Sequence, residues 1–206
     1  MPKIPAAVLL AILALSTFAG CGGSSQSQAT AASGESHFSG AEASPPQPEA
    51  PLRLDNYLGE PVNIASYKGK AVLVTFIYTH CPDVCPLIVS HIKTALALLG
   101  PKAKNAQVIA VSTDPRGDTH KTVAAFLKEH EMTGRMQYLI GTRAELGHVW
   151  KAWNIVAKPA KAGRDLVEHS ALIYGIAADG KVTTLYPANF RPAQLVHDVP
   201  LLAAET

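Results

Sequence analysis

The sequence predicts an α/β fold in which helices cover both faces of a mixed β-sheet. Residues 71–78 (AVLVTFIY) and 107–113 (QVIAVST) are continuous apolar, β-branched runs, which are typical of strands buried on both faces of a sheet. Residues 86–99 follow the first run, and their apolar side chains recur at helical spacing. A second amphipathic segment, about 119–130, follows the second run. Strand and helix therefore alternate, as in sheets layered between helices.

The later elements complete this order. Asp118 or Thr119 caps the second helix, and Asp179-Gly180 joins two short apolar runs, which is a strong β-hairpin signal. The remaining expected elements are a strand over 136–140, a helix capped by Thr142 and ending near Trp153, hairpin strands over 171–177 and 181–186, and a helix from Pro192 to about Leu202. The order matches a thioredoxin-like architecture. Residues 52–70 resemble the short strands that precede the first buried strand in the extracytoplasmic branch of that fold.

Composition limits the class of protein. With 206 residues, the chain is about the size of one ordinary domain, and 48% hydrophobic against 17% charged residues allow a real core. Lys and Arg number 18 against 16 Asp and Glu, a net charge of +2, which argues against the concentrated basic face that binds nucleic acid. Three cysteines are too few for a disulfide-stapled miniprotein. We therefore expect a globular domain with no nucleic-acid partner.

Residues 1–20 have the pattern of a secretory signal, because Lys3 precedes an uncharged apolar run that ends in small residues. The end of the run, Phe18-Ala19-Gly20-Cys21, resembles a bacterial lipoprotein processing site, at which Cys21 receives a lipid and becomes the mature N-terminus. Phe18 departs from that pattern, which usually has Leu, so ordinary cleavage or an uncleaved anchor stays open. The sequence predicts a membrane-anchored lipoprotein outside the cytoplasm.

Residues 21–51 are predicted to form a flexible tether. They are rich in Gly, Ser, Ala, Gln and Pro and contain no Lys or Arg. Such a segment cannot bury enough apolar surface to offset the entropy of ordering it. The folded domain is therefore expected to span residues 52–206.

The candidate chemistry lies where the first buried strand meets the first helix. Cys81 and Cys85 stand in the sequence Cys-Pro-Asp-Val-Cys-Pro, so both side chains can point the same way at the helix start. A helix N-terminus favours thiolate over thiol, and thiolate is the form that binds soft metals and attacks disulfides. Three residues separate the cysteines, whereas dithiol oxidoreductases of this fold usually have two between them.

A third metal ligand would come from one of eight histidines. His80 lies in the turn before Cys81, and His91 lies nearly on the helix face opposite Cys85. His169 precedes the strand whose start lies across from the cysteine loop in thioredoxin-like folds, at the place usually taken by a cis-proline. His169 is the leading candidate, although spacing alone leaves the choice open. The others are His37, His120, His130, His148 and His197.

Three segments together resemble the Sco/SenC family. They are residues 78–86 (YTHCPDVCP), 111–119 (VSTDPRGDT), and Glu168-His169-Ser170 with Asp179-Gly180. Members of this family are membrane-tethered and help to assemble the binuclear copper A centre of cytochrome c oxidase. The resemblance implies that Cys81, Cys85 and His169 bind one copper ion per monomer. It also matches Asp114 to the family's acidic loop residue beside the site, although a turn or helix-cap role explains Asp114 equally well.

The resemblance implies a metallochaperone whose partner is the copper A subunit of cytochrome c oxidase. Two thiolates and one imidazole are soft enough for Cu(I), and Cu(II) can use the same ligands with an added oxygen. The alternative is a thiol–disulfide oxidoreductase in which Cys81 and Cys85 are a redox-active pair that keeps the partner's copper-ligand cysteines reduced. A peroxidase fits less well, because its loop needs Thr or Ser three residues before the cysteine and Thr79 is two before Cys81.

Overall fold

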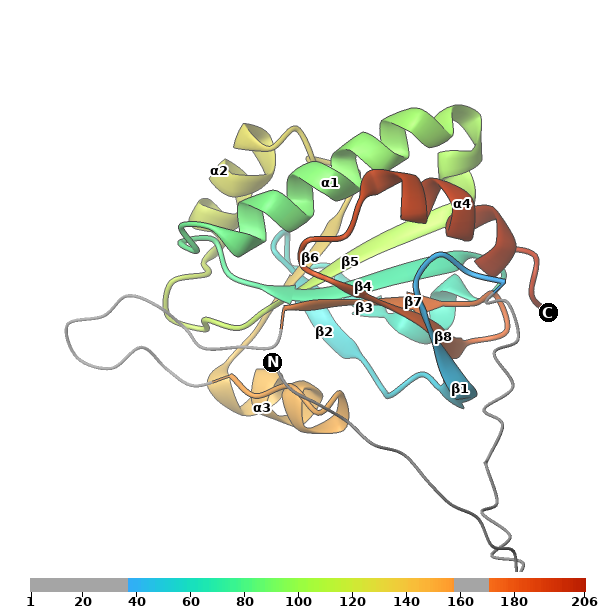
Figure 1. Ribbon diagram of the computed structural model, residues 1–206. Coiled ribbons are helices and arrows are strands. Elements are labelled where there is room, and N and C mark those ends of the chain that lie inside the picture. Colours follow the sequence, from blue (N-terminus) through green and yellow to red (C-terminus); the bar gives the residue numbers. More distant parts are fainter. Residues whose placement is uncertain (1–36, 158–170) are drawn as a thin grey trace, which may run out of the picture. The chain divides into compact units, whose positions relative to one another are not determined.

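The computed structural model describes residues 37–157 and 171–206, and these residues form a mixed sheet of eight strands with helices on both faces (Figure 1). The strand order is β1-β8-β7-β4-β5-β6-β2-β3. Strands β4, β5 and β6 are parallel, and the other pairs are antiparallel. The strands are β1 (Ala41–Pro48), β2 (Arg53–Asn56), β3 (Pro61–Asn63), β4 (Ala71–Ile77), β5 (Ala106–Ser112), β6 (Gln137–Ile140), β7 (Leu172–Ile176) and β8 (Lys181–Pro187).

The helices divide between the two faces of the sheet, as Figure 1 shows: α1, α2 and α4 lie on one face and α3 on the other. Two buried clusters follow this division, one under α1, α2 and α4 and one under α3. The helices are α1 (Val84–Leu99), α2 (His120–Glu129), α3 (Arg143–Ala152) and α4 (Pro192–Leu202), with short 3₁₀ helices at Ile64–Tyr67 and Gly100–Asn105. The predicted α/β class with a mixed, helix-flanked sheet is confirmed.

Helix boundaries follow the expected local chemistry. The Thr142 hydroxyl accepts the Glu145 backbone N–H at the start of α3, and the Glu145 carboxylate bonds back to the Thr142 N–H. At α2 the cap is Thr119 rather than Asp118. Gly100 ends α1 with a φ of 54°, a left-handed conformation that glycine adopts without strain. The β4, β5 and hairpin strands also lie within one or two residues of their predicted bounds.

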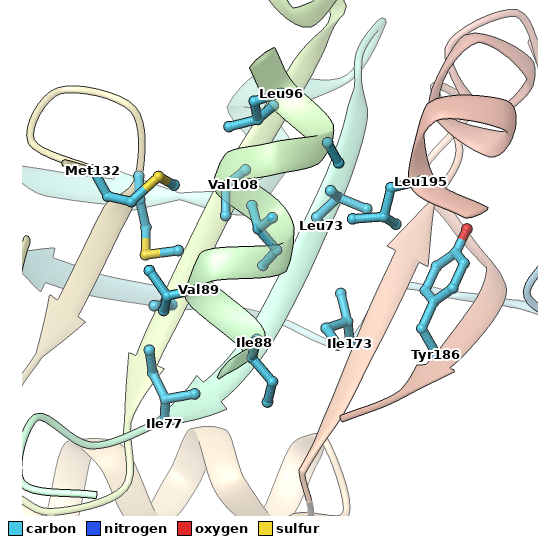
Figure 2. Packing of buried hydrophobic residues seen from close by; sticks show 14 of the residues in the cluster. Leu73, Ile77, Ile88, Val89, Leu96, Val108, Met132, Ile173, Tyr186 and Leu195 are labelled. Carbon is cyan, nitrogen blue, oxygen red and sulfur yellow. The ribbon is translucent and has the colours of Figure 1, made fainter. Parts of the chain in front are cut away.

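Helix α1 is the core helix of its face, and its packing fixes the cysteine loop. Figure 2 shows Ile88 and Val89 of α1 directed towards Ile77 and Ile173 of the sheet, and all four side chains are fully buried. The stretch Val84–Asn105 is long and apolar enough to cross a membrane by length and composition. The buried face of α1 accounts for that composition.

The prediction of a tether as far as residue 51 is wrong for its last part. Ala41–Pro48 forms β1, an edge strand that pairs with β8. We call residues 37–48 the N-terminal strap. Its composition lacks an apolar pattern because an edge strand is held through backbone hydrogen bonds and leaves its side chains exposed. The folded unit therefore begins well before residue 52.

The carboxylate of Asp198 in α4 holds the start of the strap. Asp198 is fully buried and accepts the backbone N–H groups of Ser39 and Gly40, each at 2.8 Å. A Cβ at Gly40 would come within 2.5 Å of the Tyr186 ring, so the close approach requires glycine. Phe38 is 7% exposed and joins the cluster under α1 and α4.

Candidate metal centre

The two cysteines lie together at the N-terminus of α1. Strand β4 ends at Ile77 and α1 begins at Val84, so Cys81 lies in the connecting turn and Cys85 in the first helical turn. The backbone N–H of Cys85 donates to the Cys81 sulfur at an N···S distance of 3.3 Å. Cys81 is 7% exposed and Cys85 is fully buried. The sequence prediction that both side chains face the same way is in agreement with this contact.

The surroundings of the Cys85 thiol oppose its ionisation. A hydrogen bond to Cys81 and, after it, burial raise the pKa of the Cys85 thiol far above its ordinary value. The expected stabilisation of thiolate at a helix N-terminus is therefore outweighed at Cys85. The Cys81 sulfur accepts hydrogen bonds from both the N–H and the thiol of Cys85. A soft metal ion that binds both sulfurs must displace the Cys85 proton.

Two of the predicted site residues, His169 and the lipidation candidate Cys21, lie outside the described residues. The strand after His169 is β7, which begins at Leu172. Ile173 pairs with Thr75 near the end of β4. The start of β7 therefore lies beside the end of β4, at the end of the sheet where the cysteine turn begins.

The described histidines have other surroundings. The His91 ring packs edge-on against Phe190 at 5.4 Å between centroids, and its buried Nδ1 has no hydrogen-bond partner. His80 is exposed, and its Nδ1 lies 3.1 Å from the Thr79 hydroxyl. His197 pairs with Asp198 at 2.7 Å. Across residues 37–157 and 171–206, no three His, Cys, Asp or Glu side chains are grouped to hold a metal.

Asp114 stabilises the turn after β5. Its carboxylate accepts the Arg116 N–H at 3.1 Å, and its own N–H donates to the Ser112 hydroxyl. A Cβ at Gly117 would collide with the Asp114 carboxylate and lie 3.1 Å from His80 Nδ1. Glycine at this position therefore lets the β5–α2 loop pack against the cysteine turn, and the turn role of Asp114 has direct support.

Asp118 is a residue whose role at the site the sequence did not indicate. Sequence analysis offered it only as a helix cap, but its buried carboxylate bonds Thr79, two residues before Cys81. Thr79 and Asp118 are 39 positions apart, so no local pattern indicates the contact.

Comparison with known proteins identifies the family. The SCO1/SenC family model matches residues 40–204. The human mitochondrial protein SCO1 homolog is 28% identical over 159 residues, which cover 72% of this chain and 50% of that protein. The chain thus spans about half the length of the human relative. The SCO1 protein homolog of Bacillus subtilis is 27% identical over 139 residues, covering 66% of this chain and 72% of that protein.

Solved structures give the same result. ScoI of Bradyrhizobium japonicum with copper bound is 32% identical and has a TM-score of 0.67. The match covers 76% of this chain and 99% of that one. The solved structure of BsSco, described as a member of the Sco family of cytochrome c oxidase assembly proteins with a disulfide switch, is 26% identical. Its TM-score is 0.65, and the match covers 78% of this chain and 96% of that one. The thioredoxin-like fold is thereby confirmed, and this chain belongs to the SCO1/SenC family.

Proposed function

We propose that this protein binds one copper ion through Cys81, Cys85 and His169 and delivers it to the binuclear copper A centre of cytochrome c oxidase. The observation that carries the proposal is the pair of adjacent, buried cysteine sulfurs at the start of α1. Relatives of the same fold have been solved with copper bound, and BsSco is described as a member of a family of oxidase assembly proteins.

The donor set suits copper as a cargo. Two thiolates and an imidazole are soft ligands that match Cu(I), and a low coordination number leaves room for ligand exchange with an acceptor. His169 is the proposed third ligand because β7, which begins three residues later, starts beside the end of β4. Among the described residues, no three His, Cys, Asp or Glu side chains are grouped into an alternative metal site.

We expect the reduced domain to bind one Cu(I) ion and the oxidised domain to bind essentially none. A disulfide between Cys81 and Cys85 removes both thiolates, so metal binding depends on the redox state. Anaerobic titration of residues 37–206 with Cu(I), against a competing chelator, measures the number of tightly bound ions. Two or more such ions per monomer, or equal binding by the oxidised domain, would contradict the proposed site.

The second candidate function is reduction of a partner's disulfide. The contact between the Cys85 backbone N–H and the Cys81 sulfur, which brings the two cysteines together, is the observation that favours it. In this reaction one cysteine thiolate attacks the partner disulfide, the second cysteine resolves the mixed disulfide, and the chain leaves with a Cys81–Cys85 disulfide while the partner gains two thiols. Reduction needs both cysteines but no imidazole, so His169 distinguishes the two functions.

We further propose that Cys21 carries a lipid that anchors the protein outside the cytoplasm. A solved structure of a relative from Bacillus anthracis is described as a SCO1/SenC family lipoprotein. One acyl chain gives only marginal membrane binding, so stable anchoring needs more than one. In a bacterial host, labelled fatty acid should enter the full-length protein and should not enter Cys21→Ser. An unlabelled wild type that stays in the membrane would indicate an uncleaved anchor.

A further inference from the structure

The carboxylate of Asp118 is a buried junction of four hydrogen bonds. Its Oδ1 accepts the backbone N–H and the hydroxyl of Thr79, each at 2.8 Å. Its Oδ2 accepts the hydroxyls of Ser112 at 2.6 Å and Tyr138 at 2.9 Å. Asp118 is 4% exposed, so these contacts replace the water that the carboxylate would otherwise bind.

The junction links three separate parts of the chain. Ser112 ends β5, Tyr138 lies in β6, and Thr79 lies in the turn between β4 and α1. The N–H of Asp118 also bonds the Asp114 carbonyl at 2.9 Å, which closes the loop that carries the carboxylate. The Asp118 side chain therefore connects strands β5 and β6 to the cysteine turn and holds that turn in place.

The residue type matches this position closely. All four partners are donors, and an ionised carboxylate accepts at both oxygens while offering no hydrogen that would oppose them. Burial raises the pKa of the Asp118 carboxyl, and the hydrogen bonds from Ser112, Thr79 and Tyr138 oppose that shift. A buried polar group of this kind is costly unless its partners stay in place, so it restricts the geometry around it.

We infer that Asp118 is a positioning residue, which holds Thr79 so that the turn presents the Cys81 sulfur to Cys85 and to copper. The turn is short: the Cys81 N–H bonds the Tyr78 carbonyl at 3.4 Å, and the sulfur then meets the Cys85 N–H at 3.3 Å. A shift at Thr79 therefore moves Cys81 directly. This inference rests on the proposed copper role of the cysteines.

The test compares two substitutions that each remove one hydroxyl from the same carboxylate. Thr79→Val removes a 2.8 Å bond on the cysteine turn, and Tyr138→Phe removes a 2.9 Å bond on the sheet. Loss of a supporting contact around a metal site typically weakens metal binding by about tenfold or more. We expect Thr79→Val to weaken Cu(I) binding by about that factor. Tyr138→Phe leaves the Ser112 bond and both Thr79 bonds on the carboxylate, so it should lower the unfolding midpoint and weaken Cu(I) binding by clearly less.

Two controls isolate the contact. Thr79→Ser keeps the hydroxyl, so this variant should bind Cu(I) with the wild-type affinity. Thr79 also contacts His80 Nδ1, so His80→Ala should retain the affinity if Asp118 is the relevant partner. Equal losses in Thr79→Val and Tyr138→Phe, no loss in either, or a loss in His80→Ala that matches Thr79→Val would each overturn the inference.

A second measurement separates this inference from the proposed function. Failure of the wild-type domain to bind Cu(I) would refute the copper proposal by itself. The equilibrium between dithiol and disulfide in a dithiothreitol redox buffer depends on Cys81 geometry and involves no metal. We expect Thr79→Val to shift that equilibrium from the wild-type position, and to shift it further than Tyr138→Phe does. An unshifted equilibrium in Thr79→Val would refute the positioning role even if copper binds normally.

Discussion

A fragment that starts at residue 52 should be markedly less stable than one that starts at residue 37. The shorter fragment lacks the N-terminal strap, so β8 loses its neighbour β1 and becomes an exposed sheet edge. Asp198 also loses the N–H groups of Ser39 and Gly40. Hydrogen bonds to a charged group contribute roughly 1.5–3 kcal/mol each. Water reaches the carboxylate after truncation and replaces part of this contribution. We therefore expect the free energy of unfolding to fall by about 3 kcal/mol, which is a large part of the stability of a typical domain.

Urea unfolding of fragments 37–206 and 52–206 measures this loss. Asp198→Asn in both fragments supplies the control, because the amide places an NH₂ group against one of the strap N–H donors only when the strap is present. The substitution should therefore cost more free energy of unfolding in 37–206 than in 52–206. Equal unfolding midpoints for the two fragments would show that the strap contributes nothing to the folded unit.

The N-terminal strap is the part of the fold that could not be predicted from the sequence. Residues 71–78 were predictable because a strand buried on both faces is continuously apolar. Strand β1 contains Ser, Gln and three prolines and is mostly exposed, so no side-chain pattern marks it. The pairing of β1 with β8, and the bonds of Ser39 and Gly40 with Asp198, join positions about 130 to 160 apart in the chain. Such distant partners leave no trace in local composition.

The candidate site also has features that the sequence predicts and features that it does not. The position of Cys81 and Cys85 at a strand–helix junction followed from their neighbours in sequence. The resistance of Cys85 to ionisation did not, because its main cause is the hydrogen bond to Cys81, and burial adds to it. The role of Asp118 depends on Thr79 and Tyr138, which lie 39 and 20 positions away. Its local setting, beside a helix N-terminus, predicts a cap instead.

Cells that carry His169→Ala should fail to assemble cytochrome c oxidase at ordinary copper levels and recover partly when copper is added. Both thiols stay intact in this variant, so copper keeps two ligands and loses the third. Loss of one good ligand should cost several kcal/mol, and each 1.4 kcal/mol is about tenfold in affinity. Cys81→Ala should fail under both conditions, because it also destroys the thiolate pair.

His148→Ala is a matched control for the histidine variant. His148 is an exposed residue of α3, on the opposite face of the sheet from α1 (Figure 1). We expect cells with His148→Ala to assemble the oxidase as the wild type does. Immunoblots must show equal amounts of each variant, so that a loss of assembly reports on the site rather than on protein level.

Oxidase activity of His169→Ala and Cys81→Ala cells, compared with and without added copper, tests the donor role most directly. The proposed mechanism predicts no activity in either variant at ordinary copper, and partial recovery with copper in His169→Ala alone. Normal activity in His169→Ala cells, with none in Cys81→Ala cells, would contradict the donor role. The protein would then act as a thiol–disulfide reductase through Cys81 and Cys85.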